Sequence, residues 1–210
     1  MRRLLVATTN HGKLVEIASI LNDIPLDIRT LVDFPDVAAP EETGSSFAEN
    51  ARAKALYYAR ASGELTVAED SGLAIDALDG APGMASARYG GADASYARKF
   101  ALIYDALRAK HADNSPARFV CALALARDGR VLFETEGVIE GRIAGEATGD
   151  GGFGYDPIFF YPPFGVTLAE AGDRKSTVSH RGQAFRALRA FLGSRIQILN
   201  LEPRTLHREP

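Results

Sequence analysis

The stretch LLVATTNHGKLVEIASIL, residues 4–21, decides the fold class of this chain. It begins with a short, continuously apolar run, Leu4 to Ala7, which the polar segment Thr8 to Lys13 interrupts. Apolar residues then recur at helical spacing, at Leu14, Ile17, Ala18 and Leu21. The pattern predicts a buried strand, a loop and an amphipathic helix, a succession that is typical of an α/β protein.

The residues that follow extend this pattern. Alternating apolar residues over Leu26 to Thr30 predict a second strand. Ser46 to Glu49 has the spacing of a capping box, which predicts a helix from there to about Ser62. Gly63 is expected to end that helix, because glycine adopts the left-handed conformation that closes many helices.

The second half of the chain indicates antiparallel pairing. Two strand-like runs, 117–126 and 130–137, are joined by Asp128-Gly129, a dipeptide that is typical of tight hairpins. A helix is predicted over 93–110, before this hairpin. Residues 78–91, LDGAPGMASARYGG, are so rich in Gly and Pro that we expect an irregular segment, at a lip or an interface.

Length and composition predict one compact unit. The chain has 210 residues, of which 46% are hydrophobic and 24% are charged, enough for one sizeable core. An amphipathic helix that starts near Ser179 is expected to close a single domain, residues 1–193. Residues 194–210 then form a C-terminal tail of unknown role.

Charge and cysteine content argue against several classes of function. The formal net charge of -3 and the pI of about 5.8 leave no polybasic surface for nucleic acid or for an anionic membrane. No apolar run approaches the length of a membrane span. The one cysteine, Cys121, cannot form an internal disulfide and suits a reducing compartment, so we expect a cytoplasmic protein.

The loop between the first strand and the first helix is a candidate phosphate-binding segment. Free backbone N–H groups and the positive end of the helix dipole favour phosphate at such a position. Its residues also carry hydroxyl, amide and ammonium groups; they are Thr8, Thr9, Asn10, His11, Gly12 and Lys13. The alternative is a simple helix cap, with Thr9 or Asn10 as the capping residue and Lys13 in solvent.

Asp70 is the leading catalytic candidate. It follows the strand-like run Leu65 to Ala68, so we expect it just beyond that strand's carboxyl end, where α/β sheets build their sites. Gly72 is expected to let the chain turn and expose the acid. A carboxylate there suits Mg²⁺, and Glu41 or Glu42 would supply a second one. The alternative is that Asp70 caps a turn and the two glutamates solvate a loop.

Cationic and amide groups occur in two further segments. Asn50 and Lys54 lie four residues apart on one predicted helix face, so both would reach a bound polyphosphate. Lys175, His180 and Arg181 gather near the start of the last helix and offer donors to carbonyl or phosphate oxygens. Solvated surface cations are the alternative reading of both groups.

The Gly-rich segment GDGGFGYDP, residues 149–157, is a candidate for binding a nucleobase. Its glycines allow the backbone to approach a ligand closely. Phe153 and Tyr155 offer ring faces, and Asp156 offers an acceptor before the rigid Pro157. The alternative is that these aromatic residues fill a core, which is their more common role.

Five segments together resemble the inosine-triphosphate pyrophosphatase family over about residues 4 to 192: TTNHGK, ENARAK, AEDSGL, GGFGYDPIF and KSTVSHRGQA. That family hydrolyses the non-canonical purine nucleoside triphosphates ITP, dITP and XTP to the monophosphate and pyrophosphate, and so clears them from the nucleotide pool. The resemblance implies an α/β fold with a mixed, elongated central sheet, flanking helices and two lobes around a nucleotide cleft. It also implies a small-molecule nucleotide substrate, Mg²⁺ as cofactor and a homodimer.

The resemblance assigns roles to individual residues. Asp70 matches the general base and a metal ligand, and Lys54 matches a phosphate-binding or catalytic lysine. For the second metal carboxylate the match favours Glu41, with Glu42 as the alternative. Glu69 stands where the family often has Asp and keeps the charge. The substrate-binding positions are Thr8, Thr9, Asn10, His11, Gly12, Lys13, Ser71, Phe153, Gly154, Tyr155, Asp156, Lys175, His180 and Arg181.

Two rival functions remain beside this one. A pyrophosphatase for pyrimidine or modified nucleotides would differ in the base pocket around Phe153 and His180. A catalytically silent nucleotide-binding module would keep the phosphate loop but would tolerate the loss of Asp70. Comparison of the turnover of different triphosphates tests the first rival function. Replacement of Asp70 tests the second, because a silent binding module does not depend on this residue for turnover.

Overall fold

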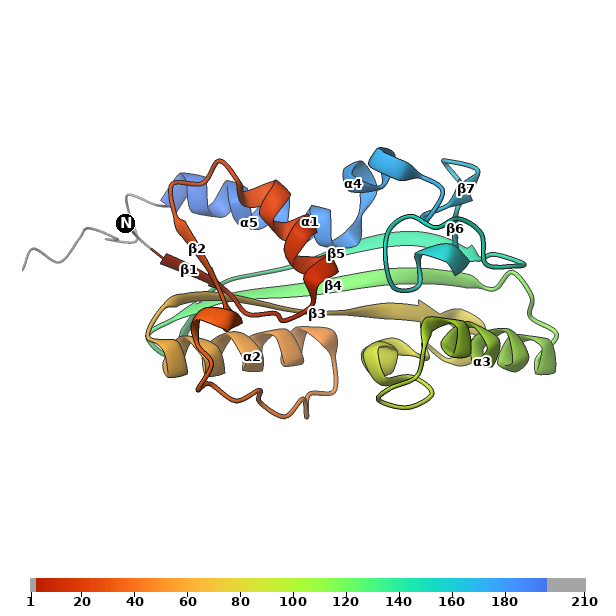
Figure 1. Cartoon of the computed structure of the whole chain (residues 1–210), viewed down its shortest axis with the longest axis horizontal. Helices are drawn as coiled ribbons and strands as arrows, with labels where there is room; N and C mark the ends of the chain where they lie inside the picture. The colour runs from red at the N-terminus through yellow and green to blue at the C-terminus, as the bar shows by residue number, and fades with distance from the viewer. Residues whose placement is uncertain (1–2, 196–210) are drawn as a thin grey trace, which may run out of the picture.

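The computed structural model describes residues 3–195 as one seven-stranded sheet with helices on both faces. The strand order is β2-β1-β3-β4-β5-β6-β7 (Figure 1). The strands are β1 (Arg3–Val6), β2 (Asp27–Thr30), β3 (Leu65–Ile75), β4 (Pro116–Arg127), β5 (Arg130–Ile143), β6 (Phe159–Tyr161) and β7 (Val166–Thr167). β1 pairs in parallel with β2 and β3, and all later pairs are antiparallel. The predicted mixed, elongated sheet is therefore confirmed.

Five α-helices flank the described sheet, with α2 and α3 along one side and α1 and α5 along the other (Figure 1). They are α1 (His11–Leu21), α2 (Phe47–Ser62), α3 (Tyr96–Ala109), α4 (Lys175–Val178) and α5 (His180–Arg195). Short 3-10 segments join them: η1 (Leu31–Asp33), η2 (Asp76–Leu78), η3 (Gly83–Arg88), η4 (Asp156–Ile158) and η5 (Gly172–Arg174). In residues 3–195, none of the helices combines the length and the apolar character needed to cross a membrane.

Local sequence signals explain where these elements begin and end. The Ser46 hydroxyl accepts from the Glu49 amide and caps α2, and Gly63 closes the helix at φ 71°. The other half of the capping box is shifted by one residue, because the Glu49 carboxylate accepts from Ser45. α3 begins later than expected, because Ser95 caps it. The predicted hairpin is confirmed as β4 and β5.

Close packing fixes the start of α5 against the sheet. A Cβ atom on Gly137 of β5 would lie 2.1 Å from the His180 carbonyl oxygen, so only glycine permits this contact. Phe185, Leu188 and Leu192 then bury the apolar side of the helix in the core. This packing anchors both residues at the start of the helix, His180 and Arg181. The helix continues to Arg195, beyond the predicted end of the domain, and the rest of the predicted tail lies outside the described residues.

The prediction that Asp70 lies beyond the end of a strand is wrong. β3 continues to Ile75, and Asp70 sits at its centre, paired with Ala122 of β4. Two adjacent acidic residues interrupt the apolar pattern of this buried strand, and in the sequence such an interruption is typical of the end of a strand. Glu69 and Asp70 are only 5% and 7% exposed, and cationic neighbours described below compensate their charges.

Gly72 also has a different role from the one expected. It continues β3 and does not turn the chain. A Cβ atom at this position would lie 2.4 Å from the Gly83 carbonyl oxygen and 2.5 Å from Ser86 Oγ. The missing side chain therefore lets η3 pack directly on β3, one residue after Ser71. The Gly- and Pro-rich segment 78–91, which was expected to be irregular, thus contains an ordered 3-10 segment.

Candidate active site

A pocket of about 410 Å³ opens where β1 ends. β1 pairs with β3 only over Leu65 to Val67, so the same edge of β3 lacks this partner from Ala68 onward. The chain leaves β1 at Ala7 and crosses this open edge before α1 begins. The site therefore does form at the carboxyl end of a strand, but the strand is β1 and not β3.

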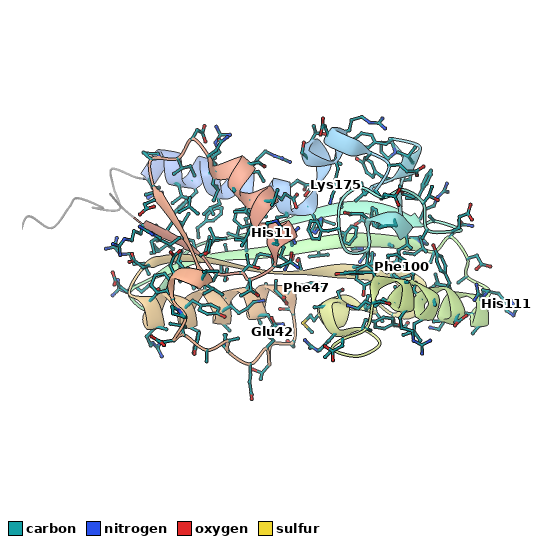
Figure 2. All side chains as sticks on the ribbon, in the orientation of Figure 1. His11, Glu42, Phe47, Phe100, His111 and Lys175 are labelled. Atoms are coloured by element: carbon teal, nitrogen blue, oxygen red, sulfur yellow. The ribbon has the colours of Figure 1, made fainter. Side chains whose placement is uncertain are left out.

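The pocket brings together most of the predicted site residues. Those that line it are Thr8, Thr9, Asn10, Lys13, Glu42, Lys54, Ser71, Phe153, Gly154, Tyr155, Asp156, Lys175, His180 and Arg181. Four lie outside the lining: His11, Gly12, Glu41 and Asp70. Figure 2 shows Glu42 on the α2 side of the long strands, whereas His11 and Lys175 lie on the opposite side. The walls therefore come from both sides of the sheet.

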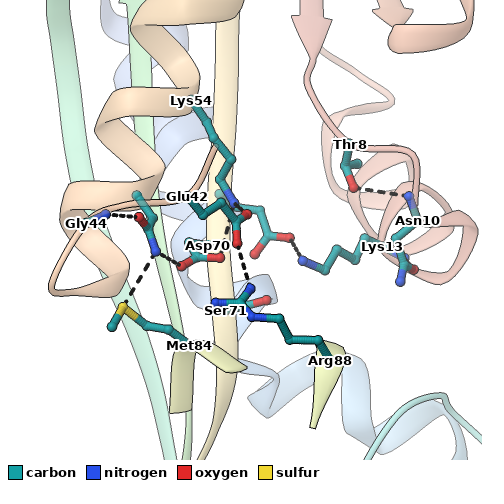
Figure 3. A network of polar contacts seen from close by, with 12 residues as sticks. Thr8, Asn10, Lys13, Glu42, Gly44, Lys54, Asp70, Ser71, Met84 and Arg88 are labelled. Atoms are coloured by element: carbon teal, nitrogen blue, oxygen red, sulfur yellow. Dashed lines mark hydrogen bonds and ion pairs between the residues drawn. The ribbon is translucent and has the colours of Figure 1, made fainter. Parts of the chain in front are cut away.

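The loop before α1 combines a helix cap with an unusual position for Lys13. The Asn10 side chain accepts from the Lys13 amide at 3.1 Å, so the capping role considered from the sequence is present. The Lys13 side chain does not extend freely into solvent, however, and is only 21% exposed. Its Nζ atom lies 2.5 Å from Glu69 Oε1, at the edge of the pocket (Figure 3). The buried Glu69 carboxylate thus holds a cation at a helix N-terminus, where phosphate is favoured.

Two side chains, one of them Lys54, hold the Asp70 carboxylate on the α2 side (Figure 3). Asn50 Nδ2 donates to Asp70 Oδ2 at 3.0 Å, and Lys54 Nζ donates to Asp70 Oδ1 at 3.1 Å. Lys54 also donates to Glu42 Oε1 at 2.8 Å, and Arg88 contacts the other oxygen of that carboxylate. The pair Asn50 and Lys54, predicted to share a helix face, therefore orients both oxygens of the acid.

The acids near Lys54 fit Mg²⁺. Glu42 and Asp70 direct one carboxylate oxygen each to the same cation, which in this structure is the Lys54 ammonium. Mg²⁺ takes one or two carboxylates and completes its shell with water and phosphate oxygens. Within residues 3–195 no group of three or more His, Cys, Asp and Glu side chains is placed to hold a metal ion. Of the two candidate glutamates, Glu42 is the one that the structure brings to Asp70.

Arg181 links the floor of the pocket to α1. Its side chain is 2% exposed and pairs with Glu16 at 3.1 Å and with Glu69 at 3.5 Å. The guanidinium nitrogen that contacts Glu69 also donates to Ser71 Oγ at 2.9 Å. Burial opposes the charge, but the neighbouring Glu69 and Glu16 carboxylates raise the pKa of Arg181 above its ordinary value. The guanidinium is therefore a permanent cation beneath the pocket.

His180 is a buried neutral imidazole. Burial and the adjacent Arg181 charge lower the pKa of His180 well below its ordinary value. Its ring stacks on Phe119 at 4.9 Å between centroids, with planes only 9° apart. Nδ1 has no hydrogen-bond partner within the described part of the chain, although it is buried. His180 lines the pocket, and an unsatisfied ring nitrogen is suited to a hydrogen bond with a ligand.

Phe153 joins the Gly-rich segment to the phosphate loop. A Cβ atom on Gly12 would lie 2.9 Å from Phe153 Cγ, so the ring packs against the start of α1. The Lys175 ammonium lies 4.6 Å from the ring centroid. Asp156 is not a free acceptor, because it accepts from the Phe153 amide at 2.7 Å and from Lys175 at 2.6 Å. Its contribution is to hold the segment in shape.

Several residues that line the pocket, and Glu16, which contacts Arg181 next to it, were not predicted from the sequence. Phe119 lies in the apolar run of β4 and resembles an ordinary core residue. Glu16 lies three residues after Lys13, and this spacing on one helix face was the only available sign of its position near the loop. Tyr96, Ser86 and Ala87 also line the pocket. They come from the segment expected to be irregular and from the start of α3, which carried no motif.

Glu69 gives the site a predictable dependence on pH. Burial opposes ionisation, but Arg181 and Lys13 hold the pKa of Glu69 well below its ordinary value of 4.5. A depressed folded-state pKa stabilises the protein above the unfolded value, and this contribution is lost as the pH falls toward the folded value. We expect Glu69→Gln to lower the free energy of unfolding by about 2 kcal/mol at pH 7, since charge-assisted hydrogen bonds are lost.

Denaturant unfolding of both proteins between pH 7 and pH 3 tests this expectation. The difference between wild type and Glu69→Gln should be constant above about pH 5 and should shrink below pH 4.5, because the unfolded wild-type chain then takes up a proton at Glu69 that the folded protein does not bind. Other carboxylates cancel in the comparison. A difference that stays constant down to pH 3 would show that the Glu69 charge does not stabilise the fold.

Fold and pocket together define an α/β protein with a mixed sheet. Its pocket is lined by Lys13 and Lys54, here called the cationic end, and by Phe153 and Tyr155, here called the aromatic end, where the cations Lys175 and Arg181 lie over the Phe153 ring. The chain belongs to the Ham1 family, whose model matches residues 4–191. This match covers all residues that line the pocket.

Named relatives agree with this family. The chain is 44% identical to the dITP/XTP pyrophosphatase of Exiguobacterium sibiricum over 191 residues, which cover 90% of this chain and 96% of that protein. It is also 44% identical to the dITP/XTP pyrophosphatase of Geobacter sulfurreducens over 194 residues, 92% of this chain and 98% of that one. A HAM1 protein from Coxiella burnetii superposes with a TM-score of 0.86 at 39% identity, over 92% of this chain and 100% of that structure.

Proposed function

We propose that this protein hydrolyses the non-canonical purine nucleoside triphosphates ITP, dITP and XTP to the monophosphate and pyrophosphate. The observation that carries the proposal is the carboxylate of Asp70, which Asn50 and Lys54 orient beside the pocket; of these three residues, Lys54 lines the pocket itself. The names of the family relatives support the substrate class. The reaction clears these nucleotides from the pool.

The cationic end divides the tasks of phosphoanhydride cleavage among its residues. Asp70 accepts the proton of the water that attacks the α-phosphorus. Lys13, Lys54 and the amides at the start of α1 neutralise the oxygens of the departing pyrophosphate. Thr8, Thr9 and Asn10 line the same end and position the phosphate chain. Positioning and charge compensation account for most of the catalysis of such reactions.

A bound Mg²⁺ would be held by Asp70 and Glu42 and would supply neutralisation of the phosphate oxygens. The convergence of these two carboxylates on Lys54 supports this assignment of ligands. Glu41 lies in the same loop but outside the pocket lining, so Glu42 is preferred here.

The aromatic end receives the base. Phe153 and Tyr155 frame it, and the unsatisfied Nδ1 atom of His180 offers a hydrogen bond to a 6-keto purine. Gly154 has a φ of 71°, in the left-handed region that favours glycine, and lies beside the Tyr96 ring. Ser71 and Arg181 also line the pocket. A 6-amino purine would place its own N–H groups against the donor of His180. Both donors would then be buried without an acceptor, which strongly disfavours binding of such a base.

The full chain is proposed to work as a cytoplasmic homodimer, with residues 1–193 as one catalytic domain. A buried, unreactive Cys121 agrees with a reducing compartment, since burial raises its pKa well above the ordinary value. The family resemblance supports the dimer. A measurement of the molar mass in solution tests it.

Initial rates with ITP, XTP, GTP and dUTP in the presence of Mg²⁺ test the proposed function. We expect ITP and XTP to be cleaved at least tenfold more efficiently than GTP and dUTP, with pyrophosphate and not orthophosphate as the product. The pocket favours a keto purine, and a mismatched hydrogen bond costs at least that factor. Equal rates for ITP, XTP and GTP would overturn the purine assignment, and preference for dUTP would favour the pyrimidine class.

A further inference from the structure

Lys99 on α3 is a buried lysine that the proposed mechanism does not use. It is 3% exposed, and its ammonium donates to the Ala87 carbonyl at 2.6 Å. The same ammonium lies 4.7 Å from the centroid of the Tyr96 ring. Burial lowers the pKa of Lys99, and no carboxylate in the described part of the chain offsets that effect. A buried ammonium without a counter-charge lowers stability, so its presence calls for another explanation.

The acceptor of Lys99 belongs to one wall of the pocket. Ser86 and Ala87, in η3, both line the pocket together with Tyr96 and Tyr155. The Ser86 carbonyl accepts from the Tyr155 hydroxyl at 2.8 Å, and the Ala87 carbonyl accepts from Lys99. Tyr96 and Tyr155 meet edge to face at 5.4 Å. Two consecutive backbone acceptors of this wall are therefore engaged by buried donors.

Engaged acceptors matter for the choice of base. A purine with an exocyclic amino group needs an acceptor for its N–H donors, and a buried donor without one is costly. Hypoxanthine and xanthine have no exocyclic amino group, whereas guanine carries one at the 2-position. The carbonyl groups of this wall already accept hydrogen bonds from Tyr155 and Lys99. They are therefore poor acceptors for the 2-amino group of guanine, which would lose its hydrogen bonds to water on binding.

We propose that Lys99 is a specificity-determining positioning residue, which holds the Ala87 carbonyl and so disfavours purines with an amino group. The proposal rests on the proposed function, because it assumes that the base lies at the aromatic end. It adds a residue behind the pocket wall, which does not itself line the pocket. η3 also reaches the catalytic acid, since Met84 Sδ accepts from Asn50, the partner of Asp70.

The substitution Lys99→Met tests the role, because it keeps the length of the side chain and removes the ammonium. We expect the ratio of kcat/KM for ITP over GTP to fall about tenfold, the effect of one hydrogen bond made available to guanine. The change should come mainly from a lower KM for GTP. The Tm should stay equal or rise, because a buried charge without a counter-charge is replaced by an apolar group.

Two matched variants serve as controls. Lys99→Arg keeps a cationic donor and should keep most of the ratio. Lys110→Met removes another ammonium that donates to a backbone carbonyl, Ala77 at 2.8 Å, but it lies exposed just after α3 and away from the pocket. It should leave the ratio unchanged.

The possible outcomes distinguish a failure of the role proposed for Lys99 from a failure of the proposed function. An unchanged ratio in Lys99→Met overturns the proposal, and so does an equal loss of ITP and GTP turnover with a lower Tm, which a merely structural role predicts. If Lys99→Met does not fold, Lys99→Leu removes the same ammonium with a shorter side chain and must show the same fall in the ratio. A wild-type enzyme without preference for ITP or XTP over GTP would instead overturn the proposed function itself.

Discussion

Replacement of Asp70 by Asn is expected to slow pyrophosphate release from ITP at least a hundredfold at saturating substrate and Mg²⁺. Asn keeps the size of the side chain and one acceptor oxygen, so the contact with Asn50 or with Lys54 survives. It cannot accept a proton from water, and loss of a general base costs a factor of 100 to 10,000. Loss of the charge also weakens the proposed Mg²⁺ site.

A matched control separates chemistry from stability. Asp105→Asn changes the same group on the exposed face of α3, where Asp105 pairs with Arg108, and should leave the rate unchanged. Both variants should keep the far-UV circular dichroism of the wild type. Unchanged pyrophosphate release by Asp70→Asn would remove Asp70 from the mechanism, and nucleotide binding without turnover in the wild type would favour a silent binding module.

Arg181→Met is expected to cause the largest loss of stability, about 3–5 kcal/mol in the free energy of unfolding. Arg181 pairs with Glu69, whose side chain is 2% exposed, and with the largely buried Glu16. Removal of the cation leaves both carboxylates undercompensated in a dry environment, which costs more than the pair itself contributes. The guanidinium also fixes Ser71, so residual activity should fall as well.

Denaturant unfolding at pH 7 measures this effect, with Arg189→Met as the control. Arg189 on the same helix pairs with Asp23, but both side chains are about half exposed. Exposed pairs contribute at most about 1 kcal/mol, so the control should lose little. The deficit of Arg181→Met should shrink below pH 4.5, where Glu69 becomes protonated in the variant first. A deficit below 1 kcal/mol at pH 7 would contradict a buried ion network.

Local signals in the sequence predicted most of the fold. The capping residue Ser46, the terminating Gly63 and the hairpin at Asp128-Gly129 act within a few residues, so their geometry follows from the local sequence. The extent of β3 was missed for the opposite reason. Its central acids are tolerated only because Lys13 and Arg181, distant in sequence, neutralise Glu69, and because Asn50 and Lys54 hold Asp70.

The candidate site divides in the same way. Motif residues such as Lys13, Lys54 and His180 were found because their chemistry is visible in a short segment. Glu16 and Phe119 were not, because their part depends on which helix and which strand face each other. Lys99 shows the limit most clearly, since an isolated lysine in a helix resembles a surface residue until the structure buries it.

The three long strands have a consequence for how the pocket selects its ligand. β3, β4 and β5 contain 11, 12 and 14 residues and form the long central part of the sheet (Figure 1). Each residue advances a strand by about 3.3 Å, and hydrogen-bonded ladders stretch very little. The sheet therefore fixes the separation of Ser71 on β3 and Phe119 on β4, which both line the pocket. A ligand has to match this fixed separation, so its size and shape contribute to its selection.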